Sequence, residues 1–281
     1  MNAEPEWIDG NRFRLAGESF GTGFDDSTTD RIVVCKPRPL VEATIALMRD
    51  LAPRRIFELG IFNGGSVALN ALVVDPDLLV AVDISEERIA ALDHLLARRG
   101  LDSRVRLYYG VDQADRDRIA AIATTEAAGA RYDLVVDDAS HRLDETRSSF
   151  ETLFPMLRPG GLYVIEDWNW QLRGLRSFRA AYREAAAGGS RPPGPAGTPP
   201  RNLYVRNFLA QSHRTPLERL AVELVLAQAC DDRVITSVRV DRRWITVERG
   251  PADLDPATFR VADHFVDYTD HRSILAHPDP A

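Results

Sequence analysis

The chain has 281 residues, 44% of them hydrophobic, which is enough for one large α/β domain with appendages. Its formal net charge of −7 disfavours nucleic acid as a partner, because phosphate binding needs a basic face. The acidic N-terminus lacks the apolar core of a signal peptide, no stretch is long enough to span a membrane, and the two cysteines have no CxxC spacing. We therefore expect a cytoplasmic protein without a membrane partner.

Regular alternation of strands and helices begins near residue 39, whereas the first 35 residues look peripheral apart from a predicted hairpin around Asp9-Gly10-Asn11. The predicted strands are Arg55–Leu59, Leu78–Val82, Val105–Tyr109, Leu134–Val136, Leu162–Ile165, Val234–Val240 and Trp244–Glu248. The predicted helices are Pro39–Asp50, Ser66–Val73, Glu86–Arg98, Asp115–Ala128, Leu143–Leu157 and Pro216–Ala229. This order predicts an α/β fold, with a mostly parallel sheet and helices on both of its faces.

The composition divides the chain into three parts: an N-terminal extension and helix (1–50), a main domain (51–250) and a polar tail (251–281). Residues 188–200 are rich in proline and glycine and cannot pack, so they predict a flexible loop. This loop follows the acidic strand end described below and is either a lid over the site or an insertion without consequence.

A glycine turn follows the first main-domain strand, in the sequence Glu58-Leu59-Gly60-Ile61-Phe62-Asn63-Gly64-Gly65-Ser66. Glycines let a backbone approach a ligand closely, but Glu58 before the first glycine would repel a pyrophosphate. A cationic or zwitterionic ligand fits better. The next strand ends at Asp83, where an acid can bind ribose hydroxyls or cap the following helix. The strand after that leads to Asp112 and Gln113, which are placed to meet an adenine.

Acids also end two later strands. Asp137, Asp138 and His141 follow the strand Leu134–Val136, and Glu166 and Asp167 follow Leu162–Ile165. The carboxyl ends of parallel strands meet at one edge of a sheet, so these side chains gather and need a cation to offset their repulsion. Carboxylate oxygens suit Mg²⁺, Mn²⁺ or Ca²⁺. Taken singly, Asp138 would more often cap a helix, and His141 would more often be a surface histidine.

The stretch from about residue 54 to residue 249 resembles the class I S-adenosylmethionine (SAM) methyltransferases. The resemblance implies a Rossmann-like fold with a seven-stranded sheet and SAM as cosubstrate. Cofactor-binding roles then fall on residues of the strand ends and the glycine turn: Glu58, Gly60, Asn63, Gly64, Ser66, Asp83, Asp112, Gln113 and Asp137.

Within that superfamily, the segment DDASH followed by IEDW resembles the metal-dependent O-methyltransferases of macrolide-sugar and other antibiotic tailoring. The resemblance implies that Asp138, Glu166 and Asp167 are metal ligands and that His141, beside Asp138, is the general base. Asp144 and Glu145 lie nearby in the sequence and are alternative bases. The segment Trp168-Asn169-Trp170 either lines an acceptor pocket or packs in the core.

The sequence therefore predicts SAM-dependent, divalent-metal-dependent O-methylation of a hydroxyl on a small molecule, first of all a sugar of a glycosylated natural product. One alternative is a catechol-type O-methyltransferase acting on an aromatic diol. Another is a protein that binds SAM without transferring methyl. The sequence leaves open whether the chain forms a homo-oligomer.

Overall fold

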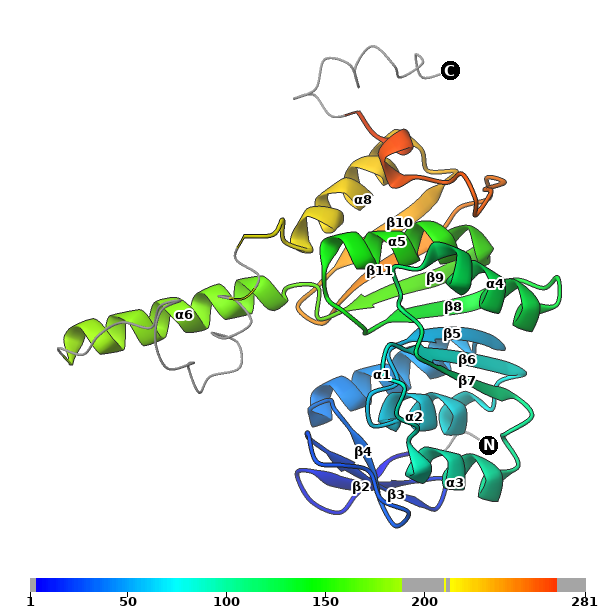
Figure 1. Ribbon diagram of the computed structural model, residues 1–281, viewed down its shortest axis with the longest axis vertical. Helices are drawn as coiled ribbons and strands as arrows, with labels where there is room; N and C mark the ends of the chain where they lie inside the picture. Colours follow the sequence, from blue (N-terminus) through cyan, green and yellow to red (C-terminus); the bar gives the residue numbers. More distant parts are fainter. Residues whose placement is uncertain (1–3, 189–209, 211–212, 267–281) are drawn as a thin grey trace.

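The computed structural model describes residues 4–188, 210 and 213–266 of the chain (Figure 1). Its central sheet has seven strands: β5 (Arg55–Leu59), β6 (Leu78–Asp83), β7 (Val105–Tyr109), β8 (Tyr132–Asp137), β9 (Leu157–Glu166), β10 (Ile235–Val240) and β11 (Trp244–Arg249). They lie in the order β10-β11-β9-β8-β5-β6-β7. Strand β11 is antiparallel to both of its neighbours, β10 and β9, and all other neighbouring pairs are parallel. The predicted α/β fold, with a seven-stranded, mostly parallel sheet, is confirmed.

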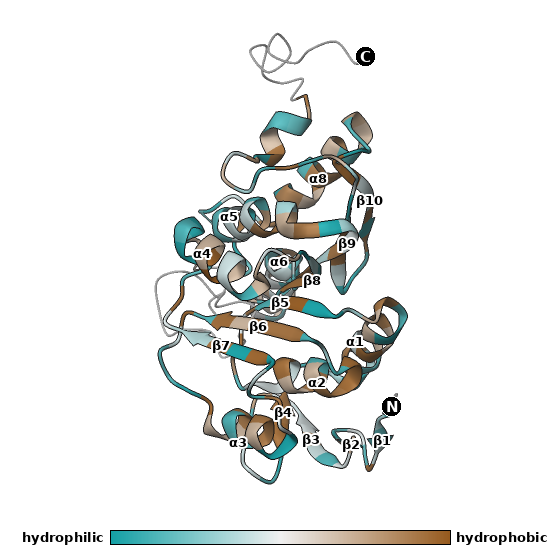
Figure 2. Cartoon of the chain, turned by 90° about the vertical axis from the view of Figure 1, so that its right-hand side faces the viewer, coloured by the Kyte–Doolittle hydropathy of each residue, from teal (hydrophilic) through white to brown (hydrophobic). Residues whose placement is uncertain are grey.

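Three helices cover each face of this sheet. One face carries α1 (Arg38–Leu51), α2 (Gly65–Val74) and α3 (Ala90–Arg99); the other carries α4 (Arg116–Ala127), α5 (Leu143–Leu153) and α8 (Glu218–Cys230). Side chains alternate between faces along a strand, so Ile56 joins the first core and Phe57 the second. Both faces of the middle strands are buried, and Figure 2 shows β6 as largely apolar. The sheet edge is consequently the place where polar side chains of these strands can meet a ligand.

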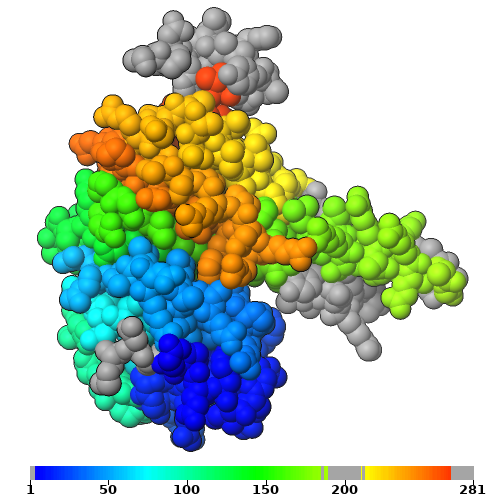
Figure 3. Space-filling view, turned by 180° about the vertical axis from the view of Figure 1, so that it is seen from behind, coloured from blue at the N-terminus to red at the C-terminus, as the bar shows by residue number. Residues whose placement is uncertain are grey.

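The N-terminal segment forms a second, four-stranded sheet of β1 (Glu6–Trp7), β2 (Arg12–Leu15), β3 (Glu18–Thr22) and β4 (Ile32–Val34). The predicted hairpin is the β1–β2 pair. The prediction that these residues are peripheral is wrong, since Phe13, Leu15 and Phe20 are buried in the core that also contains α1, α2 and α3. A Cβ at Gly65 would lie only 2.2 Å from the carbonyl oxygen of Val33, so glycine lets β4 contact the start of α2. Figure 3 shows the segment lying directly against the main body.

Three predicted boundaries need correction, two of helices and one of a strand. The helix expected from Glu86 begins at Ala90, because Asp83 and Ser85 bind the backbone N–H groups of Ser85 and Glu87 and hold the chain in turns. The helix expected to reach Leu157 ends at Leu153, just before Pro155 in the short 3₁₀ helix η1 (Phe154–Met156), since proline disfavours a continuing helix. Strand β9 consequently begins earlier than predicted.

A long helix, α6 (Trp170–Ala187), was not predicted. It follows β9 directly and extends away from the body (Figure 1 and Figure 3). A second 3₁₀ helix, η2 (Val261–His264), lies near the end of the described chain. Among the helices of the described ranges, none has the length and apolar character needed to cross a membrane. In the predicted loop 188–200, residues 189–200 lie outside the described residues, and the three-part division of the chain stays a prediction.

Candidate active site

The carboxyl ends of β5 to β9 open onto a pocket of about 1250 Å³. It lies where the strand order reverses, between β5 and β8, which is the usual place for a ligand in an open α/β sheet. Seven of the predicted site residues line it: Gly60, Asp83, Asp112, Gln113, Asp138, His141 and Asp167. Six others are described by the structure but do not line it: Glu58, Asn63, Gly64, Ser66, Asp137 and Glu166. The strand ends thus meet as the sequence predicted, but the side chains divide into two sets.

The glycine turn and Asp83 form one end of the pocket. Both oxygens of Asp83 are in use: Oδ2 accepts the N–H groups of Ile61 at 2.7 Å and Phe62 at 2.8 Å, and Oδ1 accepts that of Ser85 at 2.8 Å. Asp83 therefore holds the glycine turn in place and fixes the start of the loop after β6. It also lines the pocket. Gly60 has a φ of 98°, and a Cβ there would lie 2.5 Å from the carbonyl oxygen of Asp138. The two loops touch at Gly60, so only glycine fits.

Glu58 is fully buried behind the turn, where its Oε2 accepts the Asn70 amide at 3.0 Å. Burial raises the pKa of Glu58 to about 7. Asn63 likewise faces another way, since its Nδ2 donates to the carbonyl of Asp25 at 2.8 Å. Direct contact of Glu58 with the cofactor stays a prediction, because its carboxylate points into the space between β5 and α2.

Asp137 and Gln113 belong to a buried hydrogen-bond network. Asp137 is 2% exposed, and its Oδ2 accepts the hydroxyls of Ser149 at 2.8 Å and Tyr163 at 3.1 Å. The Gln113 Nε2 lies 3.2 Å from the same oxygen, and its Oε1 accepts the backbone N–H of Ser140 at 2.7 Å. Burial raises the pKa of Asp137 to about 6. The two residues tie β8 to α5 and fix the loop that carries His141.

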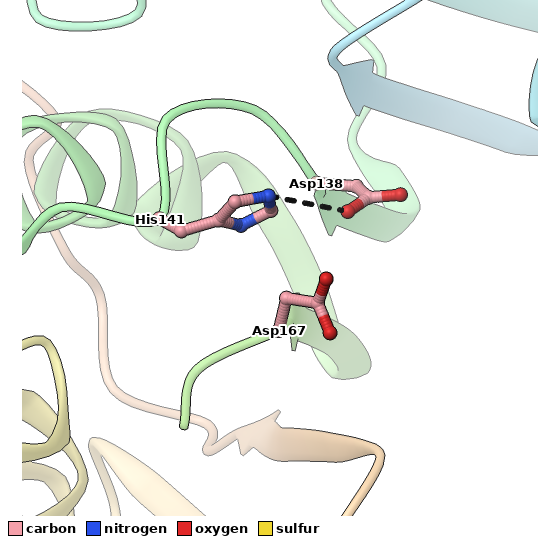
Figure 4. Close-up of side chains that lie close together, drawn as sticks. All are labelled: Asp138, His141 and Asp167. Carbon is pink, nitrogen blue, oxygen red and sulfur yellow. Dashed lines mark ion pairs between the residues drawn. The ribbon is translucent and has the colours of Figure 1, made fainter. Parts of the chain in front are cut away.

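Asp138, His141 and Asp167 come together at the other end of the pocket (Figure 4). Each offers one ligand atom, and these atoms lie within 4.8 Å of one another. The His141 Nε2 is 3.9 Å from the Asp138 Oδ1. His141 and Asp167 both have positive φ angles, 55° and 47°, which side-chain-bearing residues rarely adopt. Strained backbone of this kind is concentrated at functional sites, where it aims a side chain.

Glu166 does not belong to that group of close ligand atoms, and its carboxylate is paired with Lys36. The Lys36 Nζ lies 2.6 Å from the Glu166 Oε2 and 2.6 Å from the Asp138 Oδ2. Burial alone would lower the pKa of Lys36, but the two carboxylates raise it, so the ammonium stays charged. Burial raises the pKa of Glu166 to about 7, and Lys36 opposes that shift. Sequence reasoning missed Lys36, although one signal was present: it is the only lysine of the chain.

Helix α6 supplies two further residues to the pocket. The ring of Trp170 lies 6.1 Å from that of His141, and Arg173 forms an ion pair with Asp167. Trp168 instead packs against the core and donates its Nε1 to the carbonyl of Asp241 at 2.8 Å. Trp168 therefore follows the core interpretation, whereas Trp170 lines the pocket and its role toward an acceptor stays a prediction. The alternative bases Asp144 and Glu145 do not line this pocket, and Glu145 is 3.2 Å from the Arg142 guanidinium.

The sheet order, the helices on both faces and the pocket at the strand ends define a class I methyltransferase fold. Residues 57–168 match the sequence profile of a family described as methyltransferase domain, and this part of the chain is such a domain. A solved structure with the same fold is the S-adenosylhomocysteine-bound methyltransferase PaMTH1 of Podospora anserina. It is 19% identical with a TM-score of 0.50, and the match covers 76% of this chain and 79% of that one.

Two curated relatives are similar over shorter stretches. Demethylmacrocin O-methyltransferase of Streptomyces fradiae is 33% identical over 120 residues, which is 40% of this chain and 27% of that protein. The 8-demethyl-8-alpha-L-rhamnosyl tetracenomycin-C 2'-O-methyltransferase of Streptomyces olivaceus is 40% identical over 91 residues, which is 27% of this chain and 24% of that protein. The chain thus matches only about a quarter of the length of these relatives.

Proposed function

We propose that this protein is a SAM-dependent, divalent-metal-dependent O-methyltransferase that acts on a hydroxyl of a small molecule, first of all a sugar of a glycosylated natural product. The observation that carries the proposal is a single pocket with two chemically different ends. The glycine turn with Asp83 lies at one end, and the group of Asp138, His141 and Asp167 lies at the other. Methyl transfer between two bound molecules needs such an arrangement, because positioning supplies most of its acceleration.

The first end suits SAM. The pocket is large enough for a cofactor and an acceptor together, since typical ligand pockets measure about 300–1000 Å³. The glycine turn at Gly60 and the acids Asp83 and Asp112 line this end of the pocket. In this proposal Asp83 binds the ribose hydroxyls and Asp112 the adenine edge. SAM supplies the methyl group on its sulfonium sulfur.

The second end suits a hard divalent cation such as Mg²⁺, Mn²⁺ or Ca²⁺, because the carboxylates of Asp138 and Asp167 offer oxygen ligands at close range. The proposed ligands are Asp138, Glu166 and Asp167. His141 lies in the same close group as Asp138 and Asp167, and its imidazole is reserved for the proton. The cation would lower the pKa of the acceptor hydroxyl. His141, held by its strained loop, faces the pocket and takes the hydroxyl proton as the C–S bond breaks and the C–O bond forms.

A sugar acceptor is supported by the relatives, since the Streptomyces olivaceus protein is named for a rhamnosyl substrate. Trp170 beside His141 offers an aromatic face of the kind on which sugar rings pack. The acidic charge of the chain argues against nucleic acid as an acceptor.

The proposal is tested by incubating the purified protein with SAM, Mg²⁺ and a panel of glycosylated natural products, and by measuring S-adenosylhomocysteine formation. We expect turnover that a chelator abolishes and that Asp138→Asn lowers by at least about 100-fold. Asp102→Asn, which removes an exposed carboxylate that does not line the pocket, is the matched control and should behave like the wild type.

Three outcomes contradict the proposal in different ways. Full activity of Asp138→Asn under strict chelation would refute the metal requirement. Turnover of simple dihydroxy aromatics and of no glycoside would replace the sugar by a catechol-type acceptor. Binding of S-adenosylhomocysteine without turnover of any acceptor would indicate a SAM-binding protein that does not transfer methyl.

A further inference from the structure

The basic side chains of the pocket differ in whether they already have a partner. Among the described residues, the lysines and arginines of the lining are Lys36, Arg173, Arg242 and Arg243. The first two are paired with carboxylates of the acidic end, and Arg243 lies 2.9 Å from the Asp241 carboxylate. The guanidinium of Arg242 is exposed and forms no ion pair or hydrogen bond with any described residue. One positive charge of the lining is therefore left for a ligand.

The backbone of Arg242 is fixed by a tight turn. Arg242 lies between the end of β10 and the start of β11. The Asp241 Oδ1 accepts the backbone N–H groups of Arg243 at 2.6 Å and Trp244 at 3.0 Å, and the Asp241 N–H donates to the Trp244 carbonyl at 3.0 Å. An aspartate that accepts backbone N–H groups two and three positions later stabilises such a turn.

The turn is also tied to the segment that follows the acidic strand end. The Trp168 Nε1 donates to the Asp241 carbonyl at 2.8 Å, and the Asn169 Nδ2 donates to the Arg242 carbonyl at 3.2 Å. Both donors come directly after Asp167 in the chain, and the turn lies beside the start of α6 (Figure 1). The position of Arg242 is consequently coupled to that of a proposed metal ligand.

The chemistry of a guanidinium indicates what it would bind. Its planar fork of N–H donors matches two oxygens of one carboxylate or one phosphate, and such charge-assisted bonds are among the strong hydrogen bonds of proteins. An arginine that serves only to solvate the surface needs neither a place in a pocket lining nor a backbone held by two side chains of another segment. Arg242 has both.

We propose that Arg242 binds an anionic group of the acceptor, a carboxylate or a phosphate carried by the same molecule as the hydroxyl to be methylated. Arg242 is then a specificity-determining residue, which orients the acceptor by two parallel N–H···O bonds while its hydroxyl lies at the acidic end. This inference rests on the proposed function and narrows its acceptor to acidic glycosides.

The test compares matched pairs of sugars that differ in one anionic group. Nitrophenyl β-glucuronide and nitrophenyl β-glucoside differ by a carboxylate, and α-glucosyl phosphate and methyl α-glucoside differ by a phosphate. Dissociation constants are measured by isothermal titration calorimetry with S-adenosylhomocysteine and Mg²⁺ present, so turnover is not needed. The wild type should bind the anionic member of at least one pair about 10- to 100-fold more tightly than the neutral member. The pair that shows this preference distinguishes a carboxylate from a phosphate.

Substitutions then assign the preference to one side chain. Arg242→Gln should abolish it and change the binding of the neutral members by less than about threefold. Arg242→Lys keeps the charge without the planar fork and should retain only part of the preference. Arg239→Gln, at an exposed arginine of β10 that does not line the pocket, is the matched control and should keep the preference of the wild type. Thermal melts check that each variant folds.

Failure of the inference is distinguishable from failure of the proposed function. A preference for the anionic members that survives in Arg242→Gln would place the anion elsewhere and overturn the inference. Equal binding of both members, or binding of neither, in the wild type would overturn it as well. The proposed function is judged separately, by S-adenosylhomocysteine binding and by methyl transfer to the panel of glycosides. A protein that binds the anionic sugars through Arg242 but methylates no acceptor would keep the anion site and refute the proposed function.

Discussion

The two ends of the pocket neutralise their acids in different ways. At the glycine turn, Asp83 is held by three backbone N–H groups, two from the turn after β5 and one from the residue two positions further along the chain. At the acidic end, Asp138, Glu166 and Asp167 are held by side-chain cations, Lys36 from the N-terminal segment and Arg173 from α6.

The difference follows from the strength of the field at each end. A single carboxylate can be satisfied by local backbone dipoles, which carry partial charge only. Three carboxylates at one sheet edge need full positive charges, and the nearby backbone cannot supply them. The acidic end therefore depends on segments that are distant in sequence, and a divalent cation would enter a site whose charge is already partly balanced.

The largest effect should come from the acidic end. His141→Ala removes the side chain that takes the hydroxyl proton in the proposed function, and we expect the rate of methyl transfer to fall by about 10²- to 10⁴-fold. Single-turnover kinetics with saturating SAM would measure it. His94→Ala, at an exposed histidine of α3 away from the pocket lining, is the control. A normal rate in His141→Ala would show that another group accepts the proton.

The second largest effect should come from the contact between the two ends. In Gly60→Ala the new methyl group meets the Asp138 carbonyl, and the backbone keeps a φ that favours glycine. We expect a loss of about 2–4 kcal/mol in the free energy of unfolding. Denaturant titration checks it, and Gly10→Ala, whose Cβ would meet nothing within 4 Å, is the control. Equal stability of the two variants would mean that the loops can separate without cost.

The contrast between the two ends also explains what the sequence could predict. Strand β5, the order of the later strands and the pairing of Asp83 with its loop depend on hydrophobic runs and near neighbours, so they could be read along the chain. Lys36 lies 102 positions from Asp138 and 130 positions from Glu166 in the sequence, and no local pattern encodes contacts over such separations. The same limit applies to Glu58, Asp137 and Glu166, which end or follow strands as expected, although their side chains point away from the pocket lining.

A smaller effect is expected at the glycine turn. Asp83→Asn keeps the size of the side chain, but an amide has one acceptor oxygen and cannot receive all three N–H groups. We expect the dissociation constant of S-adenosylhomocysteine to rise by about 10- to 100-fold, since bonds to charged groups contribute about 1.5–3 kcal/mol. Isothermal titration calorimetry measures this binding. Mn²⁺ binding at the other end should stay at the wild-type level, and a parallel loss of both would show that the ends are not independent.

The smallest effect is expected in the pH dependence of stability. It distinguishes a Glu58 that is only buried from a Glu58 whose charge is stabilised for contact with a ligand. Its pKa is about 7 in the folded protein against an ordinary 4.5, so the folded state holds a proton that the unfolded state has released. Stability from this group is fully present below about pH 4.5 and is lost as the pH rises through 7. Glu58→Gln cannot release a proton, so between about pH 6 and pH 8 its free energy of unfolding should fall by about 1 kcal/mol less than that of the wild type. Denaturant titrations at both pH values check this. If the free energy of unfolding changes equally with pH in both proteins, Glu58 is already ionised at pH 6 and the protein stabilises its charge. A residue that contacts the positively charged part of SAM would need such a charge.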